Sequence, residues 1–483
     1  MIHAELSTEA RTKWEAMRRN TTISSIVIAF LTVALLLLVL GYFTLAPYLN
    51  NPEVIITYNG KSLQEEVIEN PKVNPASHQK PSAPASTSAK VIAATINSNI
   101  AIPIPEIESM NPTMSFGDGD DFGDGINGSD GGIGPGNGQG NLPPGVRKRC
   151  SKADRLQRLS EMGGNEECEE AVLKALRWMQ KNQAADGSFP GAKKSAMTGL
   201  ALLAYLGHCE TPLSEEFGDT VLKAIVYLVN LSMANDGKCA DNFTDKHWPY
   251  EHAICVYALS EATTFCKQLN IAIPNLEQAT QKSGQFLIDN QHSSGGWEYA
   301  YDESNRRGGD VSIVGWHIQA LKAMKHTDLD FKNLKLCVKK GLNYLESKQD
   351  DNGGFGYSSK KPNGSYYALT GVGVLCFQMW DKPSSSQVRK GVNYIANNTK
   401  LDWNGPCDLY AHYYEAQAML NRGGKDWQHY NAIMRDTILK NQSKEGTWLS
   451  KGHGAGLMYH TALCTLMLEV YYRFLPSSGH PIH

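Results

Sequence analysis

The segment Gln291-His-Ser-Ser-Gly-Gly-Trp297 carries a pattern that returns three more times along the chain. The shared template is a glutamine, three mostly polar residues, a glycine, any residue and a bulky aromatic residue. The other copies are Gln183-Ala-Ala-Asp-Gly-Ser-Phe189, Gln349-Asp-Asp-Asn-Gly-Gly-Phe355 and Gln442-Ser-Lys-Glu-Gly-Thr-Trp448. Four matches at one spacing indicate an internal repeat.

Each copy lies between two segments with helical periodicity. Before it, as in residues 171–180 and 341–346, apolar residues recur every three or four positions, which predicts a helix lying on a core. After it, residues 196–206 and 310–321 are more continuously apolar, which predicts a helix packed on both sides. The glycine permits a tight left-handed turn, and the glutamine can bond helix-end groups that would otherwise lack partners.

Two further pairs keep the helices but lack the glutamine turn. They are residues 221–229 with 250–259, and residues 388–395 with 408–419. The chain therefore contains six helical hairpins of about 50 residues each. Such hairpins can stack as an open solenoid or close into a ring, and closure removes the need for polar capping repeats, which neither end shows. We predict an all-α, closed (α/α)6 toroid whose inner helices surround a central cavity.

The glutamine turns resemble the repeats of triterpene cyclases such as squalene-hopene cyclase, and more loosely those of protein prenyltransferase β-subunits. The resemblance covers residues 167–476. Residues 308–322 and 459–476 are also similar to segments of membrane-anchored bacterial toroid proteins that carry squalene-cyclase-like or prenyltransferase-like repeats. The resemblance implies the α/α-toroid fold, and an isoprenoid cyclase or prenyltransferase if the protein is an enzyme.

The N-terminal region predicts a membrane anchor. Residues 1–20 are charged, whereas residues 21–49 carry no charge and include an apolar run at 23–45. Because a bilayer takes about 20 apolar residues, we predict a retained transmembrane helix; the run is too long for a signal peptide and lacks a clear cleavage site. The cations precede the span, so residues 1–20 are expected in the cytoplasm and the toroid in the periplasm. These cations are Arg11, Lys13, Arg18 and Arg19.

The rest of the chain divides by composition. Residues 50–146 are rich in proline, serine and glycine and predict a disordered linker, in which 54–58 could be a short strand without an evident partner. Residues 147–166 lead into the toroid at 167–476, and residues 477–483 form a tail. The net charge of −3 argues against a nucleic-acid partner. The expected partners are the membrane and an extracytoplasmic ligand.

Ten cysteines in an extracytoplasmic domain make disulfides plausible. We predict that Cys150 pairs with Cys168, because the two flank the lead-in segment. Cys255, Cys376 and Cys464 stand on apolar helices and are expected to be buried free thiols.

A carboxylic acid that protonates an alkene is the first catalytic candidate. The resemblance implies an Asp-x-Asp-Asp motif at the start of an inner helix, but Asp118-Gly-Asp-Asp121 lies in the glycine-rich linker and is expected to be a solvated loop. Asp310, at the expected start of the third inner helix, is the alternative proton donor, and an N-cap is its simpler role. Residues able to tune it are Glu251, His252, His412 and His460.

Metal binding is the second candidate. Prenyltransferases hold zinc with an Asp-x-Cys pair and a distant histidine, and this chain has no Asp-x-Cys. Weaker zinc candidates are Cys407, Asp408, His412, His460 and Cys464, for which capping or core roles are the alternative. We therefore expect no cofactor, with zinc as the exception to test.

Aromatic and polar residues gather at the expected starts of the inner helices. They predict a cavity rim that suits an apolar or cationic ligand: Glu251, His252, Trp316, Tyr367, Tyr410, His412, Tyr459 and His460. No Gly-x-Ser-x-Gly elbow, phosphate-binding loop or His-Glu-x-x-His helix is present. The leading hypothesis is a binding protein for a peptide, glycan or apolar molecule; the alternatives are an isoprenoid cyclase-like or prenyltransferase-like enzyme and a structural scaffold of the cell envelope.

Overall fold

A computed structural model describes residues 54–55, 150–362, 366–380, 382–405, 407–451 and 456–473. All of these belong to one compact unit. Several predicted segments lie outside the described residues: the cytoplasmic segment 1–20, the span 21–49, the linker 50–146 apart from residues 54–55, the first three residues of the lead-in 147–166, the Asp118–Asp121 loop and the tail 477–483. Of the helices that are described, none is both long enough and apolar enough to cross a bilayer.

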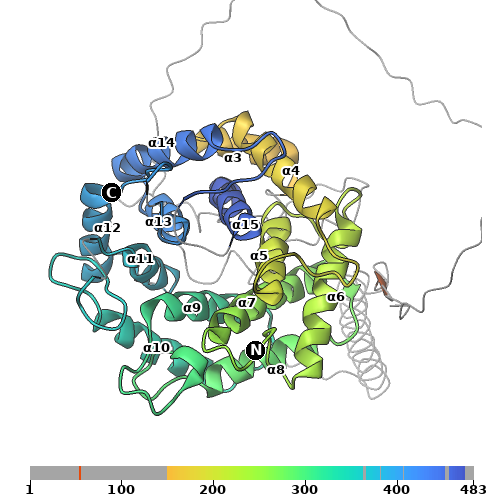
Figure 1. Ribbon diagram of the computed structural model, residues 1–483, viewed down its shortest axis with the longest axis horizontal. Coiled ribbons are helices and arrows are strands. Elements are labelled where there is room, and N and C mark those ends of the chain that lie inside the picture. Colours follow the sequence, from red (N-terminus) through yellow and green to blue (C-terminus); the bar gives the residue numbers. More distant parts are fainter. Residues whose placement is uncertain are drawn as a thin grey trace, which may run out of the picture. The chain divides into compact units, whose positions relative to one another are not determined.

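Six helical hairpins form two concentric layers (Figure 1). The outer helices bury one stripe each, whereas the inner helices are buried almost all round, as their small and apolar residues predict. The outer layer is α4 (Glu166–Lys181), α6 (Gly218–Ala234), α8 (Leu276–Asp289), α10 (Leu334–Glu346), α12 (Ser386–Asn398) and α14 (Gly424–Lys440). The inner layer is α5 (Lys194–Gly207), α7 (Trp248–Gln268), α9 (Val311–Lys325), α11 (Thr370–Met379), α13 (Leu409–Arg422) and α15 (Leu457–Leu468).

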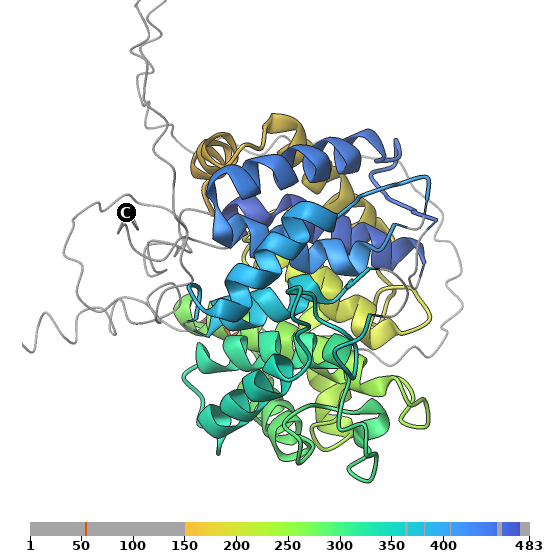
Figure 2. The ribbon, with the colours of Figure 1, turned by 90° about the vertical axis from the view of Figure 1, so that its left-hand side faces the viewer.

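The last hairpin meets the first, so the predicted closure of the ring is confirmed. Helix α15 packs against α4 and α5, and α14 against α4, as both ribbon views show (Figures 1 and 2). The Trp427 indole N–H on α14 donates to the Met162 carbonyl at 2.9 Å. Among the described helices, the array therefore has no open edge for capping repeats to cover.

Each repeated glutamine joins two hairpins. The side-chain amide of Gln442 donates to the Gly446 carbonyl in its own turn and to the Ala171 carbonyl at 2.8 Å in the first hairpin. Gln183, Gln291 and Gln349 make the same pair of bonds to their own glycine and to the next outer helix. The glutamines thus hold the neighbouring hairpin, a longer-range role than the helix-end bonding that the sequence predicted.

The glycine of the turn is required by both conformation and space. Gly446 has φ 93°, a region that other residues seldom adopt. A Cβ at this position would come within 2.6 Å of the Lys174 carbonyl oxygen on the neighbouring outer helix. The aromatic residues that end the four turns are fully buried: Phe189, Trp297, Phe355 and Trp448.

Short elements complete the described chain. The lead-in contains α3 (Lys152–Glu161), capped by Ser151, and the chain also forms η2 (Tyr299–Tyr301) and α16 (Val470–Arg473). The strand expected at residues 54–58 is present as β1 (Val54–Ile55). It pairs in parallel with β2 (Ile271–Ala272), between α7 and α8, a partner that the sequence did not reveal.

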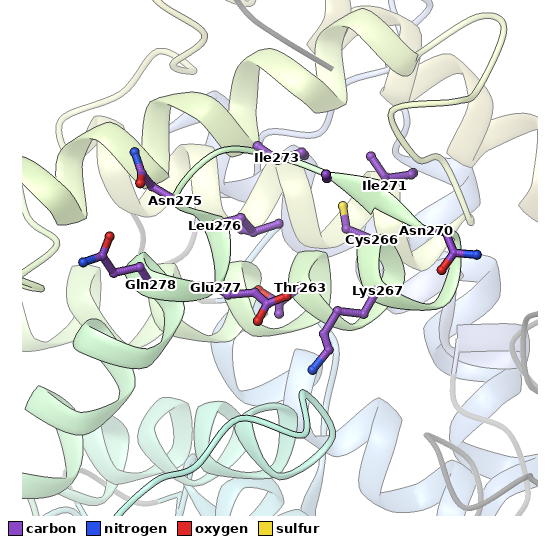
Figure 3. Close-up of a pocket in the computed structure, with 11 residues that line it drawn as sticks. Thr263, Cys266, Lys267, Asn270, Ile271, Ile273, Asn275, Leu276, Glu277 and Gln278 are labelled. Carbon is purple, nitrogen blue, oxygen red and sulfur yellow. The ribbon is translucent and has the colours of Figure 1, made fainter. Parts of the chain in front are cut away.

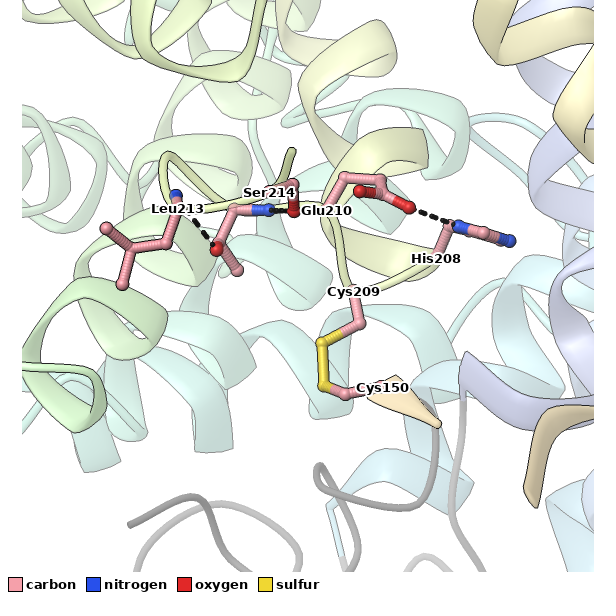
Figure 4. The surroundings of a disulfide bond; sticks show 7 residues. Cys150, His208, Cys209, Glu210, Leu213 and Ser214 are labelled. Atoms are coloured by element: carbon pink, nitrogen blue, oxygen red, sulfur yellow. Dashed lines mark hydrogen bonds and ion pairs between the residues drawn. A yellow bond between two sulfur atoms is a disulfide. The ribbon is translucent and has the colours of Figure 1, made fainter. Parts of the chain in front are cut away.

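The structure corrects the predicted disulfide. Cys150 is bonded to Cys209, with their Cα atoms 5.0 Å apart (Figure 4), and Cys168 is free. The pairing of Cys150 with Cys168 is wrong because Cys168 lies on the buried face of α4, where its thiol donates to the Asn165 side-chain oxygen at 3.2 Å. The interpretation of Cys255, Cys376 and Cys464 as buried free thiols is confirmed.

A buried charge network lies beside this disulfide. His208 contacts Glu169 at 3.2 Å and Glu210 at 2.7 Å, and Arg155 pairs with Glu169 at 2.9 Å. Burial alone would lower the pKa of His208, but its hydrogen bonds to the two carboxylates outweigh burial and raise it. The network ties α5 to the lead-in and to α4 at the carboxyl end of α5.

We expect peptide mapping under non-reducing conditions to recover Cys150 linked to Cys209. Cys209→Ser should lower the free energy of unfolding by about 2–4 kcal/mol, because the bond closes a long loop in the unfolded chain. Urea unfolding under oxidising conditions measures this loss, with the same pair of proteins under reducing conditions as the control. Recovery of a peptide linking Cys150 to Cys168 would contradict the structure.

The stabilisation by His208 should depend on pH. Since its folded pKa is raised, its contribution is fully present below the ordinary pKa of about 6.5 and is lost as pH rises through the folded value. His208→Gln should therefore destabilise the protein more at pH 6 than at pH 9 in urea unfolding. The exposed His429 on α14 provides the matched control His429→Gln. An equal loss at both pH values would show that His208 is not charged in the folded protein.

Candidate functional site

A cavity of about 540 Å³ lies where the amino-terminal ends of the inner helices meet. All six inner helices, or the residues that cap them, contribute to its wall, so it lies on the axis of the ring. The contributors are Ala196, Met197, Tyr250, Glu251, Ile254, Ser312, Trp316, Leu369, Asp408, Tyr410 and Tyr459, with Lys193, His247, Tyr299 and Tyr357 from the adjoining loops. We call this space the central cavity.

Four of the predicted rim residues line the central cavity: Glu251, Trp316, Tyr410 and Tyr459. The three predicted histidines and Tyr367 point elsewhere. His252 accepts from the Cys239 N–H at 3.1 Å, and His460 accepts from the Ser450 N–H at 3.2 Å. The reason is helical phase, because neighbouring positions on a helix point about 100° apart, which turns His252 away from the cavity that Glu251 lines and His460 away from the cavity that Tyr459 lines.

The other two predicted rim residues also serve packing. His412 contacts the Tyr430 hydroxyl at 3.1 Å and Glu415 at 3.3 Å. The Tyr367 N–H donates to the Tyr394 hydroxyl at 3.1 Å. Neither His412 on α13 nor Tyr367, in the loop before α11, is among the residues that line the central cavity.

Asp310 caps α9, which was the simpler of its two predicted roles. Its Oδ1 accepts from the Ser312 N–H at 3.0 Å and from the Ser312 hydroxyl at 2.5 Å. Arg307 lies 3.6 Å from its Oδ2. Asp310 does not line the central cavity, but it affects two hydroxyls that do. The Ser312 hydroxyl donates its hydrogen bond to Asp310. The Tyr250 hydroxyl, 2.5 Å from the Ser312 oxygen, is therefore the donor of the hydrogen bond between them. Asp310 thereby orients two hydroxyls at the cavity.

Glu251 is fixed by bonds within the protein. Its carboxylate accepts from the Ser195 hydroxyl at 2.6 Å and the Asp241 N–H at 3.0 Å, and pairs with Lys193 at 3.1 Å. Burial alone would lower the pKa of Lys193, but its bonds to Asp245 and Glu251 raise it. Glu251 therefore positions the Lys193 cation at the edge of the cavity.

Asp408 is the carboxylate best placed to meet a ligand. Its Oδ1 caps α13 by accepting from the Tyr410 N–H at 3.1 Å and the Ala411 N–H at 3.3 Å, which leaves Oδ2 for another partner. Burial raises the pKa of the Asp408 carboxyl, outweighing the helix amides and His412, which lower it. This side chain can accept a hydrogen bond from a ligand, or donate a proton to one.

The aromatic wall is held rigidly. Trp316 stacks on Tyr413 with ring centres 5.2 Å apart, and the Tyr410 hydroxyl donates to the Ser312 carbonyl at 2.6 Å. The Arg307 guanidinium lies over the Tyr299 ring, 4.7 Å from its centre. Sequence reasoning missed Lys193, Tyr299 and Tyr357, because loop residues carry no periodic signal that would assign them to a face.

The weak zinc candidates do not form a site within the described part of the chain. No group of three or more histidine, cysteine, aspartate or glutamate side chains comes together there at metal-binding distances. Asp408 faces the central cavity, whereas His412 and His460 turn away from it toward the outer layer. The set that was considered comprises Cys407, Asp408, His412, His460 and Cys464.

Among protein families, curated proteins and solved structures, only solved structures are similar to this chain. No protein-family model matches the chain, and no curated protein matches it. Among solved structures, the GH76A α-1,6-mannanase from Salegentibacter sp. HEL1_6 is similar at a TM-score of 0.48 and 9% identity, over 63% of this chain and 98% of that one. The type II terpene cyclase MstE from Scytonema is similar at 0.43 and 11%, over 64% and 98%.

A third similar structure is an unsaturated glucuronyl hydrolase specific for heparin, with a TM-score of 0.47 and 11% identity, over 64% of this chain and 97% of that one. These values are too low to assign a family or a reaction. The helical ring of this protein is established by its own hairpins and their closure.

Asp408→Asn should separate the capping role of this residue from its charge. Asparagine can still cap α13, while the buried negative charge is removed. A carboxyl whose folded pKa is raised gives stability that is present at low pH and is lost as pH rises through the folded value. The variant should therefore be more stable than the native protein at pH 7 and equally stable near pH 4, as measured by urea unfolding. A variant that is less stable at both pH values would contradict this assignment.

Proposed function

We propose that the protein binds a carbohydrate ligand of one or two sugar residues in the central cavity. The observation that carries the proposal is that Trp316, Tyr410 and other aromatic side chains line the same cavity as the Asp408 carboxylate. A sugar ring has an apolar face of C–H groups and a rim of hydroxyls. The aromatic rings can stack on the apolar face, and the carboxylate can accept hydrogen bonds from the hydroxyls. The volume of about 540 Å³ lies within the range of small-ligand sites.

The charged residues in the wall favour a polar ligand over an isoprenoid. A wholly apolar ligand would remove water from Lys193 and Asp408 without replacing its hydrogen bonds, which costs free energy. The hydroxyls of Tyr250 and Ser312 are also held in fixed directions by Asp310. Fixed hydroxyls at a cavity wall favour a ligand that hydrogen-bonds in defined geometry.

An enzymatic role is the second candidate, and the raised pKa of Asp408 supports it. A carboxyl that keeps its proton nearer neutral pH is suited to general acid catalysis. In that case Asp408, rather than Asp310, is the proton donor, because Asp408 lines the cavity and Asp310 caps α9. An isoprenoid cyclase-like reaction remains an alternative that the helical ring supports only at the level of fold.

A scaffold role has less support among the described residues. The exposed large hydrophobic residues lie on separate segments: Leu213 precedes α6, Leu336 is on α10, and Leu449 and Leu457 are close to the start of α15. An open cavity is also unnecessary for a scaffold.

We also propose that the ring is extracytoplasmic and held by a membrane span at residues 21–49. The support is the uncharged run preceded by cations. The disulfide between Cys150 and Cys209 adds to it, because such bonds persist in oxidising compartments.

Carbohydrate binding can be tested with the full chain in detergent on an array of oligosaccharides, followed by calorimetry on any oligosaccharide that is retained. Trp316→Ala should weaken binding about tenfold or more, or about 1.4 kcal/mol, since it removes a face of the wall. Tyr357→Ala, at a half-buried loop residue of the cavity lining, should act in the same direction. Trp178→Ala, at a half-buried position on the outer helix α4 that does not line the cavity, is the control and should bind normally. Binding that is equal in all four proteins would refute the site.

A further inference from the structure

The loop that carries β2 is built as an open strand edge. Asn270 and Asn275 bracket it with φ values of 53° and 63°, a left-handed conformation that asparagine tolerates better than most residues. Between them, Ile271 and Ile273 are buried and Ala272 faces outward, the alternation of a strand with one side on the core. The backbone N–H and C=O groups of this segment are thus presented along one edge.

The surroundings of this edge are hollowed. A cavity of about 500 Å³ is lined by β2, by the last turns of α7 and by the first turn of α8 (Figure 3). Its wall combines the apolar Ile271, Ile273 and Leu276 with the polar Thr263 and Glu277. An exposed strand edge beside such a hollow has the form of a site that accepts an extended peptide by strand addition.

The chain supplies such a peptide. Val54 pairs with Ile271 and Ile55 with Ala272 in parallel register, and residues 54–57 are all β-branched, as strands favour. A β-ladder of two residue pairs contributes little stability by itself. Because the strand and its partner belong to one chain, the effective concentration of the strand near β2 is on the order of millimolar.

This contact lies at the end of the ring opposite the central cavity. The central cavity is at the amino end of α7, and β2 follows its carboxyl end. Since α7 has 21 residues, the two ends are about 30 Å apart at 1.5 Å per residue. The disulfide holds Cys150 to Cys209, just beyond the carboxyl end of α5. Both attachments of the N-terminal region are therefore at this opposite end.

We propose that β2 is a docking site for the chain's own residues 54–57, and that this docking turns the central cavity away from the membrane. The orientation rests on the proposed span at residues 21–49. Docking leaves residues 50–53 between the span and the ring, which reach about 14 Å when fully extended. Without docking, the ring would be joined to the span by residues 50–149, whose root-mean-square end-to-end distance as a flexible chain is roughly 50–60 Å.

The consequence for function is the route by which the ligand arrives. A cavity that faces away from the bilayer receives its ligand from water, as a carbohydrate would arrive. A cavity for membrane isoprenoids would have to face the bilayer. The docking site thus deepens the proposed function, on which this last step rests.

The docking itself is tested by hydrogen exchange on the full chain in lipid nanodiscs. Replacing Val54 and Ile55 by aspartate should make the amides of residues 271–273 exchange about tenfold faster or more, because their strand partner is lost. The matched control replaces Val67 and Ile68, the same dipeptide in the same linker, by aspartate. Adding a synthetic peptide of residues 51–60 to the docking variant should restore slow exchange, and a scrambled peptide should not. Equal exchange in the native protein and both variants overturns the docking site.

The orientation is tested separately by energy transfer to a labelled lipid. A dye is placed on Lys194→Cys at the cavity end of α5 or on Glu215→Cys beyond its other end; both positions are exposed, and the described free cysteines are buried. Transfer should be stronger from residue 215 than from residue 194, and the difference should vanish in the docking variant. Equal or reversed transfer in the native chain overturns the orientation. If the native chain shows this difference in energy transfer but binds no carbohydrate, the proposed function is refuted and the orientation is not.

Discussion

The bond between a turn and the next hairpin is the interaction on which the ring depends. A side-chain amide such as that of Gln291 satisfies its own glycine carbonyl and a carbonyl of the following outer helix at once. Four of the six junctions between hairpins use this contact, whereas the turns that follow α6 and α12 lack the glutamine. The last copy, Gln442, then reaches Ala171 in the first hairpin instead of a seventh one. The ring is therefore closed by the same contact that joins neighbouring hairpins at three other junctions.

Closure also determines where a site can form. Every inner helix runs in the same direction, so the amino-terminal ends meet at one end of the ring, where the central cavity opens. The carboxyl ends meet at the other end, which buries polar residues: Arg473 pairs with Glu261 at 3.2 Å, and Arg155 with Glu169 at 2.9 Å. Buried pairs of this kind are expensive to separate. Buried ion pairs thus stabilise the end of the ring at the carboxyl ends of the inner helices, and the cavity at the amino-terminal ends is available to a ligand.

The sequence was sufficient for the parts of the structure that repeat. Four turn motifs and the helical periodicity predicted the hairpins, because each hairpin rests on contacts between residues close in sequence, and the lack of a polar capping repeat at either end predicted closure. The disulfide and the strand pair depend on contacts between distant segments, so proximity in sequence suggested Cys168 where the fold brings Cys209 to Cys150. Val54 likewise pairs with Ile271, from which five described helices, α3 to α7, separate it along the chain.

The candidate site was predicted in composition but only partly in detail. Helix starts rich in aromatic residues and carboxylates were visible, and Glu251, Trp316, Tyr410 and Tyr459 do line the cavity. Asp310 and Asp408 had the same sequence signal, an aspartate before an apolar inner helix, and both cap. What separates them is the position of the side chain, since Asp408 lines the central cavity and Asp310 does not. Their shared role bears on the ligand: converging helix amino termini favour an anion, but these carboxylates offset that charge, which leaves a wall suited to a neutral polar molecule.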